Sequence, residues 1–338
     1  MKALLVFVVW AQLSSSRAEP SPQPIAPLLL DSTNCNDSNT IKVSGLALQE
    51  INRNRREGYI YNLVSIRSAL KQSQGNAGMV YYLTLGVDET ECHVLSRKDW
   101  RSCESRMFHQ SVAGECNATL HINNLERIVC LHDYNCSLTS ADRRTVSEIC
   151  PDCPIDRDDK ENESSINSAN KALTNYNQNS NNTKYFNLLN VTKYSFQGMF
   201  FEAHFVEFTI METACSKKQT VKNLSKCKPL APGVAQFGFC KASVQIVNMK
   251  DGTTVTCELY QPEEYRDLNH PDHCRNQALI EQLPRDPRAM RKGQTSGMPT
   301  FMQMNETAEN LVVLPYFPLK RSSSSSCPYS VGGTNSIR

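Results

Sequence analysis

The sequence lacks an excess of charge of either sign. Its 338 residues contain 36 Lys and Arg against 34 Asp and Glu, which gives a net charge of +2. Binding to nucleic acid or to an anionic membrane surface normally needs a clear basic excess, so this composition favours neither. We therefore expect no nucleic acid and no membrane among its partners, and we expect recognition to depend on shape.

Catalytic signatures are also missing. The chain contains no HExxH, P-loop, dinucleotide fingerprint or nucleophile elbow, and its seven histidines are scattered without metal-ligand spacing. One CxxC is present, at Cys150 and Cys153, whereas a zinc ribbon needs two, and no βαβ pattern surrounds it as in redox enzymes. These absences predict a binding protein without a cofactor rather than an enzyme.

Long apolar runs are absent beyond the first residues. The run from Ala3 to Leu13 follows a single Lys and precedes small residues that end at Ala18, which is the pattern of a secretory signal. A membrane-spanning helix needs roughly 20 apolar residues, about twice this length. We expect residues 1–18 to be a signal peptide, the mature chain to begin near Glu19, and the product to be secreted and extracellular.

Cysteine is abundant. The chain has 14 cysteines, an even number, which in an exported protein indicates a disulfide framework because the secretory compartment is oxidising. Sequons for N-glycosylation fit the same compartment. They lie at Asn36, Asn117, Asn135, Asn162, Asn181, Asn190, Asn223 and Asn305.

The two halves of the chain repeat one order of elements, namely a polar helix, long alternating strands and two successive cysteine pairs. In the first half, residues 46–66 change from helical to strand-like spacing, and an alternating strand follows over 79–87. In the second half, a helix is predicted over 166–178 and strands over 185–196 and 200–211. Asp251-Gly252 predicts a hairpin turn between two β-branched runs. The fold class is therefore α+β, with an antiparallel sheet wrapped around one helix in each domain.

The expected domain plan follows from this repeat. The first domain covers 31–149, a CPDCP linker covers 150–154, and the second domain covers 155–262. The region 263–338 is rich in Pro and polar residues without strong periodicity, which indicates a flexible tail over 263–326 that Cys327 ties back to the rest of the chain.

Several segments resemble the fetuin family, whose members carry tandem cystatin-like domains. These segments are Cys35-Asn36-Asp37-Ser38, residues 81–94, Asp99-Trp100, Tyr134-Asn135-Cys136, the linker, residues 204–208, Gly238-Phe239-Cys240-Lys241 and residues 311–315. The resemblance covers most of the mature chain and implies two cystatin-like domains. It also implies the disulfides Cys35–Cys327, Cys92–Cys103, Cys116–Cys136, Cys150–Cys153, Cys215–Cys227 and Cys240–Cys257. Cys130 and Cys274 remain: they could bridge each other, join two chains or stay free, so we expect a monomer unless they pair between chains.

The linker is the candidate functional site. A disulfide between Cys150 and Cys153 would close a very small ring, and Pro151 and Pro154 restrict φ on either side of Asp152. A carboxylate presented on such a rigid projection can coordinate zinc in place of the catalytic water. The resemblance implies inhibition of astacin-type metalloproteinases through this linker, with Asp152 on the zinc of the target. The alternative is that CPDCP only staples the two domains together.

Hairpin tips are the second candidate contact, because cystatin-like domains use them as wedges. In the second domain they are expected near 197–201 and 250–253, with contacts from Gln197, Gly198, Met199, Phe200, Lys250, Asp251 and Gly252. The family pattern Q-x-V-x-G is only partly kept, because Phe201 replaces the final Gly; the alternative is an aromatic cluster that covers the core. The first-domain counterpart, residues 74–78, places polar Asn76 at its centre.

Two other functions are kept as alternatives. A carrier of calcium phosphate mineral would need acidic strand faces, and the first domain offers only Asp88, Glu89 and Glu91, at one end of a strand. A cysteine-proteinase inhibitor of the cystatin type would need intact hairpin motifs, and both are altered.

Overall fold

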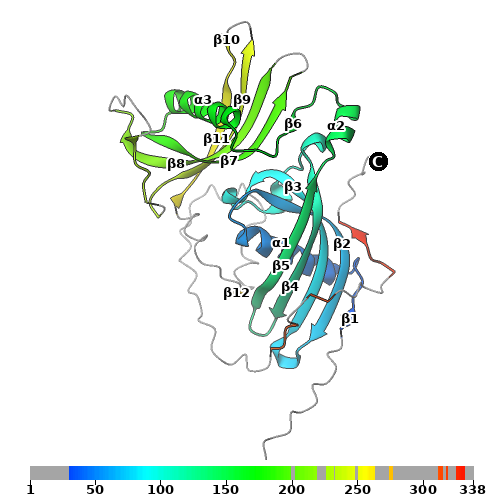
Figure 1. Cartoon of the computed structure of the whole chain (residues 1–338). Helices are drawn as coiled ribbons and strands as arrows, with labels where there is room; N and C mark the ends of the chain where they lie inside the picture. The colour runs from blue at the N-terminus through cyan, green and yellow to red at the C-terminus, as the bar shows by residue number, and fades with distance from the viewer. Residues whose placement is uncertain are drawn as a thin grey trace, which may run out of the picture.

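The computed structural model describes residues 30–198, 202–218, 226–231, 233–247, 250–262, 274–276, 311–314, 317–318 and 325–331. Two domains follow each other along the chain, and in each a single long helix packs on an antiparallel sheet (Figure 1). This arrangement confirms the α+β class. The expected signal peptide, residues 1–18, lies outside the described residues.

The first domain contains a seven-stranded sheet with the order β1-β2-β3-β4-β5-β12, and β13 also pairs with β2. Its helix α1 packs against β2, β4 and β5. The elements are β1 (Asp31–Ser32), α1 (Ser38–Asn54), β2 (Tyr59–Ser73), β3 (Met79–His93), β4 (Val112–Asn123), β5 (Ile128–Ser140), β12 (Cys274–Asn276) and β13 (Tyr329–Ser330).

The second domain has a six-stranded sheet with the order β10-β9-β8-β7-β6, and β11 also pairs with β9. A short helix, α2 (Arg143–Ile149), connects the two domains. The elements of the second domain are β6 (Ile155–Asp156), α3 (Glu163–Asn179), β7 (Lys184–Gln197), β8 (Ala203–Ser216), β9 (Phe237–Val247), β10 (Lys250–Asp251) and β11 (Thr254–Tyr260).

Helix α1 shows how sequence sets these boundaries. The carboxylate of Asp37 accepts hydrogen bonds from the backbone N–H groups of Asn39 (3.0 Å) and Thr40 (3.1 Å), which satisfies two donors that a helix start leaves open. Apolar side chains at helical spacing, including Leu48 and Ile51, are fully buried against the sheet. The helix is therefore fixed by its cap and by one apolar face.

The two domains share a specific helix-to-strand contact. The Asn52 side chain forms two hydrogen bonds, both 2.8 Å, with the backbone N–H and C=O of Tyr61. In the second domain Asn177 does the same with Phe186, at 3.0 and 2.9 Å. Each Asn is buried and forms two hydrogen bonds to one residue of the strand, so it fixes the end of the helix to the first long strand in both domains. The repeat seen in the sequence therefore extends to individual hydrogen bonds.

Part of the C-terminal region packs on the first domain. Leu311, Val313, Leu314 and Phe317 contact a buried cluster of Leu70, Val80 and Tyr82. Further on, β13 pairs with β2, and Cys327 is bonded to Cys35. The expected tie through Cys327 is confirmed, whereas the expectation of a flexible tail over 263–326 is wrong for Leu311, Val313, Leu314 and Phe317, because these side chains pack on the sheet. Residues 277–310 lie outside the described residues.

Six disulfides join cysteines within the described ranges in the pairs that the resemblance implies. Cys130 is also disulfide-bonded, and the register of β5 with β12 sets Cys274 directly opposite it. The two cysteines that fell outside the family pattern therefore face each other within one chain.

Candidate functional site

The linker begins where α2 ends. Asp142 caps this helix by accepting from the backbone N–H of Thr145 (3.0 Å), and the N–H of Cys150 donates to the carbonyl of Val146 (2.8 Å). The N–H of Cys153 then donates to the carbonyl of Cys150 (3.1 Å), and the disulfide joins the same two residues. Residues 150–153 thus form one tight turn that is closed twice, by a hydrogen bond and by a covalent bond.

Both ends of the linker are anchored, and to different domains. On the first-domain side, Val146 is buried, and His109 shares its small pocket. On the second-domain side, β6 pairs with β7, with Ile155 opposite Phe196. Helix α2 and β6 meet at the junction of the two domains (Figure 1). The turn is therefore a bridge between two fixed points.

A lysine strengthens the base of this bridge. Lys193 of β7 lies 2.8 Å from the carboxylate of Asp156 and donates to the carbonyl of Gln110 in the first domain (3.4 Å). Arg143 and Asp158 form a second ion pair across the base, at 2.5 Å. Both partners of that second pair are exposed, so it adds little energy, whereas Lys193 is nearly buried.

Asp152 is half-buried, and its Oδ1 is shielded from solvent. This Oδ1 accepts no hydrogen bond from any residue within the described ranges. The sequence predicts a carboxylate that projects fully from the chain, whereas the structure leaves Asp152 only partly exposed. A shielded carboxylate oxygen without a partner is costly.

The register of the second sheet brings the linker and the hairpin tips to one edge. Ile155 pairs with Phe196 near the end of β7, Gln197 pairs with Ala203 at the start of β8, and Ala203 pairs with Gln245 near the end of β9. The linker therefore adjoins the same edge of the sheet at which β7 and β9 end. Gly198 is described within the first tip, whereas Met199, Phe200 and Phe201 lie outside the described residues.

The second tip differs from expectation. Asp251 does not form the turn, because it lies in β10 opposite Ile246, and Lys250 lies opposite Val247. Gly252 continues the same pairing, since its N–H donates to the carbonyl of Gln245 (3.1 Å). The reversal falls at residues 248–249, outside the described residues; a two-residue connection suits the twist of paired strands, which overrides the Asp-Gly signal.

Comparisons with known proteins match this architecture. The model of the cystatin domain matches residues 29–124 and 153–248. Human fetuin-B is 36% identical over 246 residues, which are 72% of this chain and 63% of that protein, and bovine fetuin-B is 35% identical over 85% of this chain and 73% of that protein. The chain belongs to the fetuin-B family. Among solved structures, mouse fetuin-B bound to human meprin beta has a TM-score of 0.61 at 36% identity, covering 71% of this chain and 76% of that one. Mouse fetuin-B bound to crayfish astacin has a TM-score of 0.58 at 35% identity, covering 71% of each.

The first-domain counterpart of the hairpin wedge is occupied in this fetuin-B family member by its own chain. The side-chain amide of Gln74 donates to the carbonyl of Val312 (2.8 Å) and accepts from the N–H of Val312 (3.3 Å). Gly78 closes the loop with a φ of +97°, and a Cβ there would lie 2.2 Å from the carbonyl oxygen of Ile122. The outer Gln of the motif thus binds the C-terminal segment.

The sequons differ in accessibility. Asn36, Asn135, Asn181 and Asn190 are exposed. Asn117 accepts from Thr84 (2.9 Å), and Asn162 caps α3, so both half-buried side chains have structural hydrogen bonds. Asn223 and Asn305 lie outside the described residues. None of the helices in the described part of the chain is long and apolar enough to cross a membrane.

Sequence reasoning missed the contacts between the two domains. Arg106, Tyr59 and Glu207 meet at the domain boundary, although Arg106 and Glu207 are 101 residues apart in the chain. No local pattern marks them, because each is an ordinary polar residue within its own segment. The one available signal was the position of Arg106 just after the Cys92–Cys103 loop.

Proposed function

We propose that this chain is a secreted inhibitor of astacin-type zinc metalloproteinases. The observation that supports the proposal is that Asp152, on a doubly closed turn, lies at the edge of the second domain where β7 and β9 end. A carboxylate on such a short closed turn, beside the ends of two strands, suits an elongated active-site cleft. Members of the same family have been solved in complex with meprin beta and with astacin, and this supports the assignment of the target class.

In the proposed mechanism, Asp152 binds the catalytic zinc of the target. A carboxylate oxygen coordinates zinc at roughly 2.0–2.2 Å and takes the position that the catalytic water needs. The Oδ1 of Asp152 accepts no hydrogen bond from the described residues, so the side chain can turn this shielded oxygen toward the zinc without breaking such a bond. Because the turn is already closed, little conformational entropy is lost on binding.

The charge of Asp152 can be tested separately from its shape. Asp152→Asn keeps the size of the side chain but removes the anionic ligand, so we expect the inhibition constant against an astacin-type proteinase to rise by at least about 100-fold. Asp133→Asn is a matched control, because Asp133 is exposed on β5 of the first domain and carries the same charge. An inhibition constant that is equal for the Asp152 variant and its control would refute the zinc-ligand role.

Contacts of the described residues weigh against the two alternative functions. Glu91 pairs with Lys241 of the second domain, and burial raises the pKa of both Asp88 and Glu89, so these three acids do not form an open acidic face for a mineral surface. Gln74 is bound to Val312 and is not free to enter a papain-like cleft.

A further inference from the structure

The two domains share a small apolar cluster at their boundary. Tyr59 and Leu95 of the first domain are buried with Phe239 and Tyr260 of the second. His93 stacks on the ring of Phe239, with 4.7 Å between the ring centroids. Interfaces between domains of one chain commonly permit relative motion unless they are well packed, so this cluster already restricts the hinge.

Arg106 lies in the polar part of this boundary, and its side chain is fully buried. Its guanidinium forms two hydrogen bonds with the carboxylate of Glu207 across the boundary, at 3.0 and 3.4 Å. Its Nε donates to the carbonyl of Thr90 (3.2 Å), and its plane lies 3.8 Å from the centre of the Tyr59 ring. The fork geometry of Arg is thus used in full, which Lys could not reproduce.

Glu207 also makes its contacts at the domain boundary. Its side chain is 12% exposed, and the hydroxyl of Tyr59 also donates to it. Burial opposes ionisation of Glu207, but the charge and hydrogen bonds of Arg106 outweigh it and hold the pKa of Glu207 below its ordinary value. Burial likewise opposes the charge of Arg106, yet Glu207 raises the pKa of Arg106. Among the described residues, the closest ion-pair partner of each charge therefore comes from the other domain, at 3.0 Å, while Glu91 of the first domain lies 3.9 Å from Arg106.

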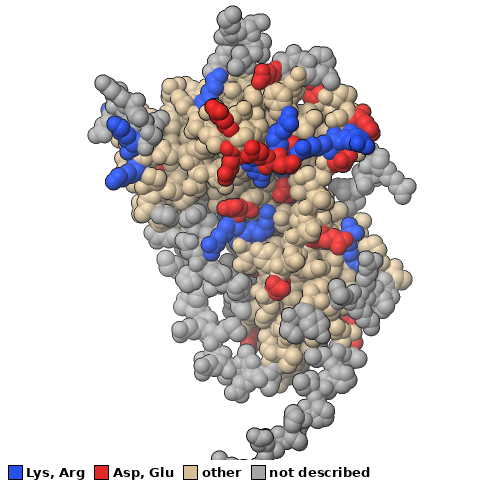
Figure 2. All heavy atoms as spheres, viewed as in Figure 1, with Lys and Arg blue, Asp and Glu red and all other residues tan. Residues whose placement is uncertain are grey.

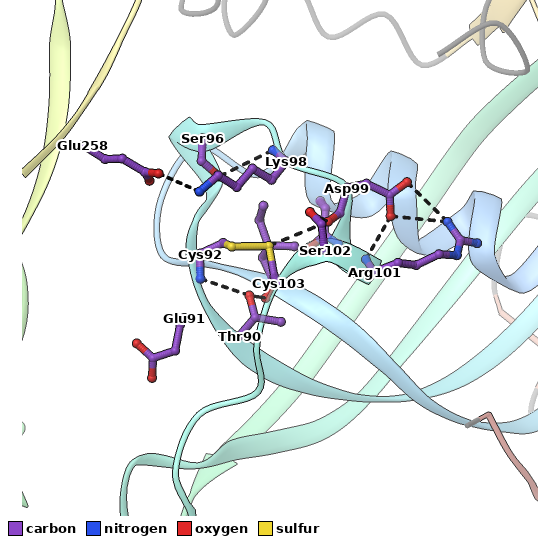
Figure 3. Close-up of a disulfide and its surroundings, with 12 residues drawn as sticks. Thr90, Glu91, Cys92, Ser96, Lys98, Asp99, Arg101, Ser102, Cys103 and Glu258 are labelled. Carbon is purple, nitrogen blue, oxygen red and sulfur yellow. Dashed lines mark hydrogen bonds and ion pairs between the residues drawn. A yellow bond between two sulfur atoms is a disulfide. The ribbon is translucent and has the colours of Figure 1, made fainter. Parts of the chain in front are cut away.

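Charged side chains of both signs also meet around the boundary (Figure 2). Lys241 pairs with Glu91, and Lys98, from the loop closed by Cys92–Cys103, lies 2.6 Å from Glu258 of β11 (Figure 3). These outer pairs are partly exposed and contribute little each. The buried Arg106–Glu207 pair is the specific element, because separating the domains would remove both hydrogen bonds from Arg106 to Glu207 and leave Arg106 only the Glu91 carboxylate of its own domain, 3.9 Å away.

We propose that Arg106 is a positioning residue that fixes the two domains relative to each other and thereby fixes the ends of the inhibitory linker. The linker turn connects α2 on the first domain to β6 on the second. Rotation of one domain relative to the other would therefore displace Cys150 relative to Pro154. It would also turn Asp152 away from the edge where β7 and β9 end. This inference rests on the proposed function, since it concerns the geometry of the same inhibitory edge.

The first test is Arg106→Ala in the full chain. We expect the inhibition constant against an astacin-type proteinase to rise at least about tenfold through loss of preorganisation, and small-angle X-ray scattering to report a more extended molecule. The matched control is Arg67→Ala, which removes an exposed Arg paired with Glu115 within the first domain (3.0 Å). The control should leave both measurements unchanged.

A second variant addresses misfolding of the single mutant. Arg106→Met with Glu207→Met replaces the buried pair by apolar side chains of similar volume, a change that is often neutral or stabilising. We expect this double variant to stay compact and to inhibit within about threefold of the wild type, because the boundary stays packed. Compact double variants that have lost inhibition would overturn a positioning role, and so would Arg106→Ala if it remained compact and fully inhibitory.

The scattering measurement separates this inference from the proposed function. If the wild-type chain fails to inhibit any astacin-type proteinase, the proposed function is wrong. Suppose instead that the wild-type chain inhibits, that Asp152→Asn abolishes inhibition, and that Arg106→Ala changes neither shape nor inhibition. In that case only the positioning role of Arg106 is wrong.

Discussion

Removing the Cys150–Cys153 disulfide tests whether rigidity of the linker contributes to inhibition. The perturbation is the double substitution Cys150→Ser and Cys153→Ser. The bond spans a sequence separation of 3, so the closed ring contains only four residues. A ring of that size restricts an otherwise free segment by about 2 kcal/mol of chain entropy at 25 °C.

An open linker has to lose that entropy when it enters the target. We therefore expect the inhibition constant to rise roughly 20- to 30-fold. The assay is a titration of an astacin-type proteinase with wild-type and variant chains. The hydrogen bond from the N–H of residue 153 to the carbonyl of residue 150 remains possible in the variant, so the turn should keep part of its order.

Stability provides the control for this experiment. Removal of the disulfide frees the unfolded chain as well, so the variant should be less stable by no more than about 2 kcal/mol, because the turn lies outside both apolar cores. Inhibition that equals the wild type, measured where urea unfolding shows both chains to be folded, would refute the argument from rigidity. Asp152 would then act as a ligand without help from its ring.

Two further predictions concern stability. His93 is buried, and burial lowers its pKa to about 4. Between that value and roughly pH 6.5 the unfolded chain binds a proton that the folded chain does not, so stability should fall as pH falls through this window, by on the order of 3 kcal/mol. His93→Phe should flatten this pH dependence in urea unfolding measured from pH 7 to 5. Asn177→Ala should destabilise the second domain by about 2–5 kcal/mol, because the buried N–H and C=O of Phe186 lose their partners. Asn179→Ala, on the exposed end of α3, should change the free energy of unfolding by less than about 0.5 kcal/mol. Equal effects of the two Asn variants, or a His93→Phe chain with the same pH dependence as the wild type, would contradict these assignments.

Much of the fold follows from local patterns in the sequence. The helix over Glu163–Asn179 and the two strands that follow it, β7 and β8, have the expected periodicities, and the repeat of cysteine pairs marks two similar domains. The β9–β10 reversal was misplaced because an Asp-Gly pair is a strong local signal, whereas the pairing of Lys250 with Val247 depends on the whole hairpin. Local turn preference gave way to strand register.

The candidate site could be predicted only in part. The linker is conspicuous because two cysteines and two prolines surround one carboxylate within five residues. Its partial burial could not be foreseen, because it depends on the three-dimensional structure around the turn. The Arg106–Glu207 contact depends on the relative placement of two domains, and a single sequence holds no periodic signal for such a pair.

The return of the C-terminal segment to the first domain has a consequence for biosynthesis. Cys35 bonds to Cys327 over a separation of 292 residues, and Leu311, Val313 and Leu314 cover Leu70, Val80 and Tyr82. The first domain to leave the ribosome is therefore completed last, after the whole second domain has been made. A chain that stops shortly after Tyr260 would retain every residue of both cystatin sheets up to that point. It would nevertheless carry two unpaired thiols, because Cys327 and Cys274 would no longer face Cys35 and Cys130, and an uncovered apolar face. These are features by which quality control retains a secretory protein.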